Sequence, residues 1–571
     1  MSRRLPWALV SILVTDRHVD EIADRYVEEY AALDPISAAY MGIDGYGDRL
    51  TDYSPEAFEE REALTRKALA DATAAVPVDE REAVARDAFL ERLALEVELD
   101  EAGITRSRVS VISSAVHAIR EVFDLMPTSS EQDWADVDAR LAAIPVALEG
   151  YRRTLRQEAE AGRVSAARQY REVVAQIASW TGRTGQGRDL LGNLVARCDV
   201  PRLATQLQEH AVTANAALDE FAAFMAEELV PRGRARDGVG RADYQLDSRY
   251  FLGAAIDLDE TYAWGWEELA RIEADMDATA DRILAGADRA AAVEHLEQDP
   301  ARRITGREAF RDWMQELADR TLSELADTHF DIPEPIRRIE CMLAPTNDGG
   351  IYYTGPSEDF SRAGRMWWSV PDGIDEFHPW REVTTVYHEG VPGHHLQVGQ
   401  TAVRADVLNR WQRLMCWVSG HGEGWALYAE RLMDELGYLD DPADRLGMLD
   451  AQALRAARVI VDIGMHLELE IPADNPFGFH PGEKWTPDLG YEFMCQHSAM
   501  EESFIRFEVN RYLGWPGQAP SYKVGERIWL EARDQARERA GDEFDLATFH
   551  RQALDLGALG LDPLKQALAR L

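Results

Sequence analysis

The sequence predicts a mainly helical fold that also contains a small β-sheet. Over residues 16–326, apolar residues recur at spacings of three and four, as in Ile22, Tyr26 and Tyr30, which is the period of amphipathic helices. Proline and glycine fall between these segments, for example at 231–233. After residue 331, short aromatic stretches bounded by turn residues indicate strands instead. These three observations define the expected fold class.

The change in pattern near residue 330 divides the chain into two predicted regions. Residues 1–330 form a predicted helical domain without a fixed-period repeat. Residues 331–571 begin with expected strands over 336–343, 350–354 and 365–370, and return to helices after Pro379. A chain of 571 residues exceeds one ordinary domain, so two regions fit its length.

The charge of the chain excludes several classes of partner. It has 61 basic and 102 acidic residues, which gives a net charge of -41. Nucleic acids and anionic membranes both attract clustered positive charge, so we expect neither as a partner. The four cysteines form no C-x-x-C pair and predict neither a disulfide framework nor a thiolate metal site.

The first 14 residues have the outline of a signal peptide, with two arginines before a short apolar stretch. No small-x-small cleavage site follows, and the apolar stretch is too short to span a bilayer. We therefore expect a cytoplasmic protein, with export as the alternative.

Three histidines and a glutamate lie within eight residues of an expected helix that Pro379 opens. They are His388, Glu389, His394 and His395. A catalytic zinc takes three protein ligands, usually imidazoles and a carboxylate, and keeps one position for water. A glutamate beside the ion then accepts the proton of that water. The pattern therefore predicts a zinc site with Glu389 as the general base.

The spacing departs from the common H-E-x-x-H pattern, because Pro392 stands where the second histidine is expected. On an unbroken helix, residues six or seven apart are separated by about 9 to 10 Å, too far for two imidazoles to share one ion. Proline lacks a backbone N–H and glycine permits unusual dihedral angles. We therefore expect a backbone irregularity at Pro392 and Gly393 that brings a histidine, at 394 or 395, back to His388.

Glu423 is the expected third ligand. It stands at the start of a predicted helix whose next residues include Trp425 and Tyr428, and a charged group among such neighbours needs a partner. The alternative is a helix-terminal carboxylate that faces solvent.

Three stretches together resemble the bacterial family called domain of unknown function 885. They are HEGVPGHHLQ at 388–397, EGWALYAE at 423–430 and PGQAPSYKVG at 516–525, and residues 34–55 fit as well. The resemblance covers nearly the whole chain. That family is regarded as zinc-dependent peptidases, distantly similar to thimet oligopeptidase and the thermostable carboxypeptidases. It implies a multi-helical metallopeptidase-like architecture with a deep cleft and a small sheet near the metal site.

The resemblance also implies roles for individual residues. In those relatives the second histidine ligand follows a glycine, which favours His394 as ligand and leaves His395 to contact substrate. Glu423 resembles the glutamate of the ligand helix in related aminopeptidases, and Glu389 takes the role of the base. The chain departs from the family at 467–484, which separates His466 from a Trp-Thr pair and is expected to form a loop at the pocket wall.

The segment near residue 520 offers residues that could support catalysis. Turn residues surround Tyr522, so its hydroxyl is expected to donate to the developing oxyanion. Arg511, Tyr512 and Lys523 are expected to bind substrate, with the two cations holding a carboxylate. Surface salt bridges are the alternative for these cations.

Two further expectations rest on position in the chain. His466 lies four residues after Asp462, so on a helix the carboxylate would orient the imidazole for a catalytic role, although a core histidine is the alternative. Either 351–353 or 366–368 is expected to be an edge strand on which an extended peptide lies.

Together these expectations predict a zinc-dependent hydrolase that cleaves amide bonds of short peptides or peptide-like small molecules. The alternatives are a metal-dependent amidase acting on a non-peptide small molecule, and a non-catalytic helical binding protein. A binding protein would not need Glu389 beside His388, which favours the hydrolase.

Overall fold

The protein is described by a computed structural model over residues 18–184, 188–326, 328–344, 350–357, 360–371 and 373–570. The segment that resembles a signal peptide lies outside these residues. Most of the described chain is helical, as predicted, and the strands form two small sheets. Within the described ranges, no helix combines the length and apolar character needed to cross a bilayer.

Helices account for most of the chain before residue 330. They are α1 (His18–Leu33), α2 (Pro35–Met41), α3 (Pro55–Ala74), α4 (Glu80–Glu101), α5 (Ile104–Ser107), α6 (Ala115–Leu125), α7 (Glu131–Glu160), α8 (Ala167–Trp180), α9 (Leu190–Val195), α10 (Pro201–Phe224), η1 (Met225–Leu229), α11 (Arg241–Leu252), α12 (Leu258–Ile283), α13 (Arg289–Gln298), η2 (Pro300–Arg302) and α14 (Arg307–Leu325). A two-residue strand, β1 (Ile304–Thr305), also occurs here and pairs with β5 (Glu376–Phe377).

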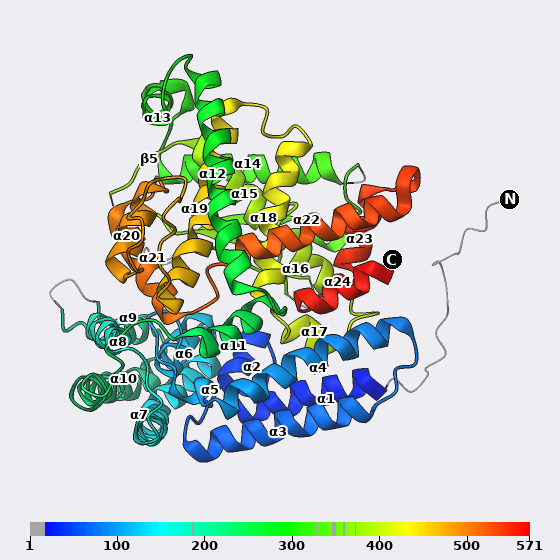
Figure 1. Ribbon diagram of the computed structural model, residues 1–571. Coiled ribbons are helices and arrows are strands. Elements are labelled where there is room, and N and C mark those ends of the chain that lie inside the picture. Colours follow the sequence, from blue (N-terminus) through cyan, green and yellow to red (C-terminus); the bar gives the residue numbers. More distant parts are fainter. Residues whose placement is uncertain are drawn as a thin grey trace.

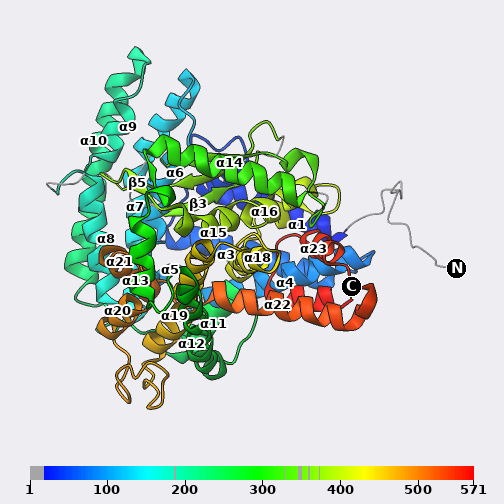
Figure 2. The same cartoon turned by 90° about the horizontal axis from the view of Figure 1, so that it is seen from above.

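The buried apolar residues form two clusters. The smaller cluster lies mainly among α6–α10, which stand together at one side of the molecule (Figures 1 and 2). The larger cluster contains residues from both sides of position 330, Tyr26 and Trp529 among them. The predicted domain boundary at 330 therefore stays a prediction.

The three-stranded sheet follows the short turn η3 (Glu334–Ile336). Its order is β2 (Ile339–Leu343), β4 (Gly364–Trp368) and β3 (Ile351–Thr354), with β2 parallel and β3 antiparallel to β4. The expected strands are thus present, with β2 starting later than predicted. The alternative that 366–368 form an edge strand is wrong, because β4 is paired on both sides. β3 is an edge strand.

The helices that follow the sheet carry the motifs found in the sequence. They are α15 (Pro379–Glu389), α16 (His394–Val403), α17 (Arg410–Leu414), α18 (Ser419–Glu435), α19 (Pro442–Leu467), α20 (Pro487–Gln496), α21 (Glu502–Gly514), α22 (Ser521–Ala540), η4 (Gly541–Glu543), α23 (Leu546–Leu554) and α24 (Leu561–Arg570). Pro379 opens α15, as predicted.

The expected irregularity after His388 is a complete break between two helices. α15 ends at Glu389 and α16 starts at His394, so the four residues between them turn the chain. The turn needs glycine at 393, since a Cβ there would lie 1.9 Å from the carbonyl oxygen of His388.

Helices α18 and α22 cross at very short range. A Cβ added to Gly424 would lie 2.5 Å from the backbone of Gly525, and one added to Gly525 would lie 2.2 Å from the carbonyl oxygen of Gly420. Only glycine permits this approach. The crossing brings the start of α22, which carries Tyr522, next to the turn of α18 that carries Glu423.

The segment that departs from the family pattern packs away from the predicted ligands. Phe479 stacks on Trp485 at 5.7 Å between ring centroids, and Trp485 lies against Trp266 of α12 at 6.3 Å. The contacts of this segment are therefore those of an aromatic cluster in the larger core.

Candidate metal centre

Three side chains from three different helices converge at the break after α15. His388 lies in the last turn of α15, His394 begins α16, and Glu423 lies in the second turn of α18 rather than at its start. Oε2 of Glu423 lies 3.3 Å from Nε2 of His388 and 3.4 Å from Nε2 of His394. One ligand atom from each residue lies within 4.8 Å of the other two. The structure thus brings together the three predicted ligands.

These separations suit ligands of one small ion. Charge-assisted hydrogen bonds between nitrogen and a carboxylate are usually about 2.7–2.9 Å long. Two ligands of a tetrahedral ion with bonds of about 2.0–2.1 Å lie roughly 3.3–3.4 Å apart. Oε2 of Glu423 is also buried without a hydrogen-bond partner among the described residues. The set of two imidazoles and a carboxylate could therefore hold a divalent metal.

The charges in the cluster depend strongly on one another. Burial alone would lower the pKa of His388, but the adjacent carboxylates of Glu423 and Glu430 outweigh it and raise the pKa to about 9. Burial would raise the pKa of Glu423, but the charge of His394 and the contacts with both histidines hold it far below its ordinary value. A metal ion that binds here must therefore displace a proton from His388.

Glu389 is placed to accept a proton. It follows His388 directly, its side chain is buried, and Oε2 has no hydrogen-bond partner within the described ranges. Burial raises the pKa of Glu389 above its ordinary value, against the opposing charges of His394 and His388. A carboxylate with these properties suits a general base.

Glu430 supports the candidate site, although the sequence did not single it out. Its Oε1 accepts a hydrogen bond from Nδ1 of His388 at 2.7 Å, and its other oxygen accepts one from the hydroxyl of Thr384. Such a carboxylate fixes the orientation of a ligating imidazole. The available signal was the spacing, because Glu430 lies seven residues after Glu423 and thus on the same helix face.

Tyr522 has a free hydroxyl near the cluster. The hydroxyl makes no hydrogen bond to any residue that the structure describes, and the guanidinium groups of Arg455 and Arg458 lie 5.8 and 5.0 Å from the ring centre. Burial raises the pKa of Tyr522, and the charge of Glu423 adds to this effect. The hydroxyl therefore stays protonated and can donate, as expected for an oxyanion donor.

Trp417 was not predicted and stands beside the cluster. Its ring centroid lies 6.1 Å from that of His394, and its side chain is 54% exposed. It packs over Gly422, where a Cβ would lie 2.4 Å from the ring. An exposed tryptophan leaves no pattern in the sequence, so only the fold could reveal this neighbour.

The structure corrects the expectation for the two cations. Lys523 is buried, and its Nζ donates to Glu526 and Gln452 and lies 2.9 Å from Glu268. Its charge is thus neutralised inside the protein. The alternative of a surface salt bridge is wrong as well, because a buried cation requires such partners.

Arg511 is also committed to internal partners. Its Nε and Nη2 donate to the two carboxylate oxygens of Glu508 at 2.8 Å each, and Nη1 donates to Gln518. The hydroxyl of Tyr512 donates to Glu508 at 2.7 Å and accepts from Arg458 at 2.9 Å. The bidentate grip expected for a substrate is made with Glu508 instead.

His395 is not available for a ligand or a substrate. Its Nε2 donates to the carbonyl of Ile336 at 2.8 Å, and its Nδ1 accepts from the hydroxyl of Tyr353 at 2.9 Å. Burial lowers the pKa of His395 to about 4, so the ring is neutral. Its contacts attach α16 to β3 and to the turn before β2.

His466 is a core histidine, the alternative raised for it above. Its Nε2 donates to the carbonyl of Tyr512 at 3.0 Å, whereas Asp462 lies 3.7 Å away. Asp462 accepts from the hydroxyl of Tyr244 at 2.6 Å and from the backbone N–H of Gly517 at 2.9 Å. These bonds attach α19 to α11 and α21, and none of them reaches the metal centre.

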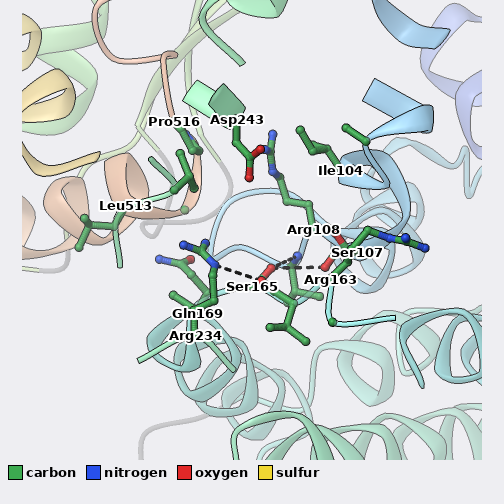
Figure 3. Close-up of a pocket in the computed structure, with 17 residues that line it drawn as sticks. Ile104, Ser107, Arg108, Arg163, Ser165, Gln169, Arg234, Asp243, Leu513 and Pro516 are labelled. Carbon is green, nitrogen blue, oxygen red and sulfur yellow. Dashed lines mark hydrogen bonds between the residues drawn. The ribbon is translucent and has the colours of Figure 1, made fainter. Parts of the chain in front are cut away.

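A cavity lies elsewhere, between the end of α21 with the residues that follow it and helices α5 and α8. Arg108, Ser165 and Gln169 line it from one side, and Leu513 and Pro516 from the other (Figure 3). None of the converging metal-centre residues lines it. This cavity is therefore not the cleft expected around the metal.

Comparisons with known proteins support the family and the fold. A family model described as "Bacterial protein of unknown function (DUF885)" matches residues 35–568. None of the curated proteins matches the chain. A solved structure described as a "putative lipoprotein" from Colwellia psychrerythraea is similar with a TM-score of 0.83 and 21% identity, covering 97% of this chain and 98% of that one. A "putative lipoprotein of unknown function" from Shewanella oneidensis gives a TM-score of 0.72 and 16% identity, over 96% and 99%. At these identities the likeness concerns the fold alone.

Proposed function

Since the chain belongs to the bacterial DUF885 family, whose description assigns no activity, we propose its function from its own residues: a zinc-dependent hydrolase that cleaves amide bonds of short peptides. The observation that carries this proposal is the pair of separations from Glu423 to His388 and His394, 3.3 and 3.4 Å. They match the spacing of ligands around tetrahedral zinc, and the donor set is that of catalytic zinc sites.

The neighbouring residues supply the other parts of a hydrolytic reaction. Zinc held by this triad would supply Lewis acidity, which makes water acidic and polarises a carbonyl group. Glu389 accepts the proton of the attacking water and returns it to the amine that leaves when the C–N bond breaks. The free hydroxyl of Tyr522 donates to the oxygen on which negative charge develops. Glu430 keeps the ring of His388 in the orientation that the reaction needs.

The sheet supports an extended peptide as the substrate. Among the described residues β3 pairs with β4 alone, so its other edge can pair with a peptide backbone. The hydroxyl of Tyr353 in this strand donates to His395, the residue next to His394. Burial raises the pKa of Tyr353, and the charge of Glu389 adds to this effect. β3 therefore lies close to the metal centre. We propose a metallopeptidase-like arrangement in which the peptide follows this strand.

The decisive experiment compares the wild-type chain with Glu389→Gln. Both proteins are expected to hold one zinc per chain by mass spectrometry of the metal. Wild type should cleave a ladder of short peptides, and the variant should lose about 10²–10⁴-fold in kcat, because it keeps the ion but has no base. Glu382→Gln is the matched control, since it changes a carboxylate two turns earlier on α15 and should keep activity.

Other outcomes point to the remaining alternatives. Equal turnover by wild type and Glu389→Gln would remove the base assignment. A chain that neither contains nor takes up zinc would favour the non-catalytic binding protein. Cleavage of acyl amides without cleavage of peptides would favour the amidase. The cytoplasmic location stays a prediction, which fractionation of cells that express the full chain can test against export.

A further inference from the structure

Buried cations outnumber their carboxylate partner beside the metal centre. Arg458 and Arg511 both bind the single carboxylate of Glu508, Arg458 through Nη2 at 2.7 Å and Arg511 in the bidentate arrangement. All three residues are at most 8% exposed. The pair of arginines therefore keeps one positive charge more than Glu508 neutralises. A buried net charge of this kind is costly unless an anion accompanies it.

Arg455, one turn earlier on α19, adds a second incompletely paired cation. Its Nη1 donates to the carbonyl of Ala451 at 3.1 Å, and its buried Nε has no partner among the described residues. The carboxylate of Glu430 lies 3.7 Å from Nη2, but its oxygens already accept from His388 and Thr384. Arg455 thus shares the carboxylate of Glu430 with His388 and Thr384.

The donors that these residues leave unused lie around one ring. Arg455 and Arg458 face the ring of Tyr522 at 5.8 and 5.0 Å, and the Tyr522 hydroxyl is free, as is Nη1 of Arg458 within the described part of the chain. Two carboxylates of the candidate metal centre act on this group. The charge of Glu423 raises the pKa of Tyr522, and the charge of Arg455 opposes the rise in the pKa of Glu389. The free donors therefore border the proposed reaction centre.

We propose that Arg458 and Arg455, which both face the ring of Tyr522, form a binding site for a carboxylate of the substrate, next to the amide bond that is cleaved. This inference rests on the proposed hydrolase function and names its substrate class. A guanidinium group binds a carboxylate through paired N–H donors, and a single negative charge balances the excess in the cluster. An uncharged group at the same position would leave the cation without an anion.

The carboxylate can come from the end of a peptide or from an acidic side chain, and matched substrates distinguish these sources. We would use N-acetylated tripeptides in three forms: a free carboxyl terminus, a terminal amide, and a terminal amide with aspartate as the last residue. Wild type is expected to cleave the free acid with a kcat/KM at least tenfold above that of the plain amide, mainly through KM. If aspartate restores the rate of the amide form, the side chain is an accepted source.

Two variants of Arg458 test the assignment. Arg458→Met should reduce kcat/KM for the free acid at least tenfold more than for the amide, whereas Arg458→Lys should keep part of the preference. Glu508 keeps its bidentate bond to Arg511 in both, so the cluster retains an ion pair. Arg533→Met is the matched control, because Arg533 binds Glu435 and faces Tyr428 as Arg458 binds Glu508 and faces Tyr512. It should leave the ratio unchanged.

The failures of the two proposals look different. Equal cleavage of acid and amide forms by wild type overturns the carboxylate site and leaves the hydrolase intact. A preference for the acid that survives Arg458→Met and Arg458→Lys also overturns it. If zinc-loaded wild type cleaves no form faster than Glu389→Gln does, the hydrolase proposal fails, and this inference fails with it.

Discussion

The metal centre and the ion cluster around Lys523 are both buried and both charged, yet their polar atoms are used differently. At Lys523 the ammonium group donates to Gln452 and Glu526 and lies against Glu268, so the charge is balanced within the protein. At the metal centre, ligand atoms of His388, His394 and Glu423 face one another. The first arrangement holds helices together. The second suits a ligand that the chain does not itself provide.

The largest effect should come from removing the cation of the first cluster. Lys523→Met leaves Glu526 buried without its main partner, so the free energy of unfolding should fall by about 3–5 kcal/mol. Denaturant unfolding of the metal-free chain measures this loss, and the zinc content should stay near one per chain. His394→Ala is the counterpart and should abolish zinc binding with a much smaller loss of stability. If Lys523→Met abolished zinc binding while His394→Ala did not, the comparison would be reversed.

An intermediate effect should come from Glu430, which is not a predicted ligand but accepts a hydrogen bond from the predicted ligand His388. Glu430→Gln should weaken zinc binding about 10–100-fold, since the ring of His388 loses its charged hydrogen-bond acceptor. Competition with a chelator of known affinity measures the change. Glu435→Gln, at the end of the same helix, should leave zinc affinity unaltered. Equal effects of the two variants would argue that only general damage to α18 is being measured.

A separate, pH-dependent effect should appear at Asp462, a buried carboxylate that holds helices together. Burial raises the pKa of Asp462 to about 7, against the hydrogen bond from Tyr244. In the unfolded chain its pKa is about 3.9, so the folded state binds the extra proton between these values. The contribution to stability is therefore fully present below about pH 4 and is lost as the pH rises through 7, by at most about 1.4 kcal/mol per pH unit.

Asp462→Asn removes this term and keeps an oxygen for both donors. Relative to wild type, the metal-free variant should therefore gain stability between pH 5 and pH 8, which thermal unfolding at the two pH values can measure. A difference that shrank over this interval would contradict the assignment.

The sequence was informative where chemistry is concentrated in a short stretch. His388, Glu389 and a second histidine at 394 or 395 could be predicted from residue type, and the position of the chain break from Pro392 and Gly393. The partners of Lys523 could not be predicted, because Glu268 lies far away in the chain and only packing of α12 against α22 brings them together. The same holds for Arg511, whose bidentate bond is available to any nearby carboxylate.

Two other residues show why the remainder of the site needed the fold. Choosing His394 over His395 required the resemblance to a family, since spacing alone left both open. The fold then shows His395 engaged by Ile336 and Tyr353. Arg458 looked like any other arginine on an amphipathic helix, and its importance follows only from the shared carboxylate of Glu508.

The close crossing of Gly424 and Gly525 has a consequence for how the site is completed during synthesis. A growing chain that has passed residue 430 already contains every ligand of the triad and the carboxylate behind His388. The hydroxyl of Tyr522 arrives about ninety residues later, when α22 docks against α18. A chain interrupted before residue 521 would therefore carry the ligands for an ion and lack the donor for an oxyanion, so that metal uptake could precede competence for hydrolysis.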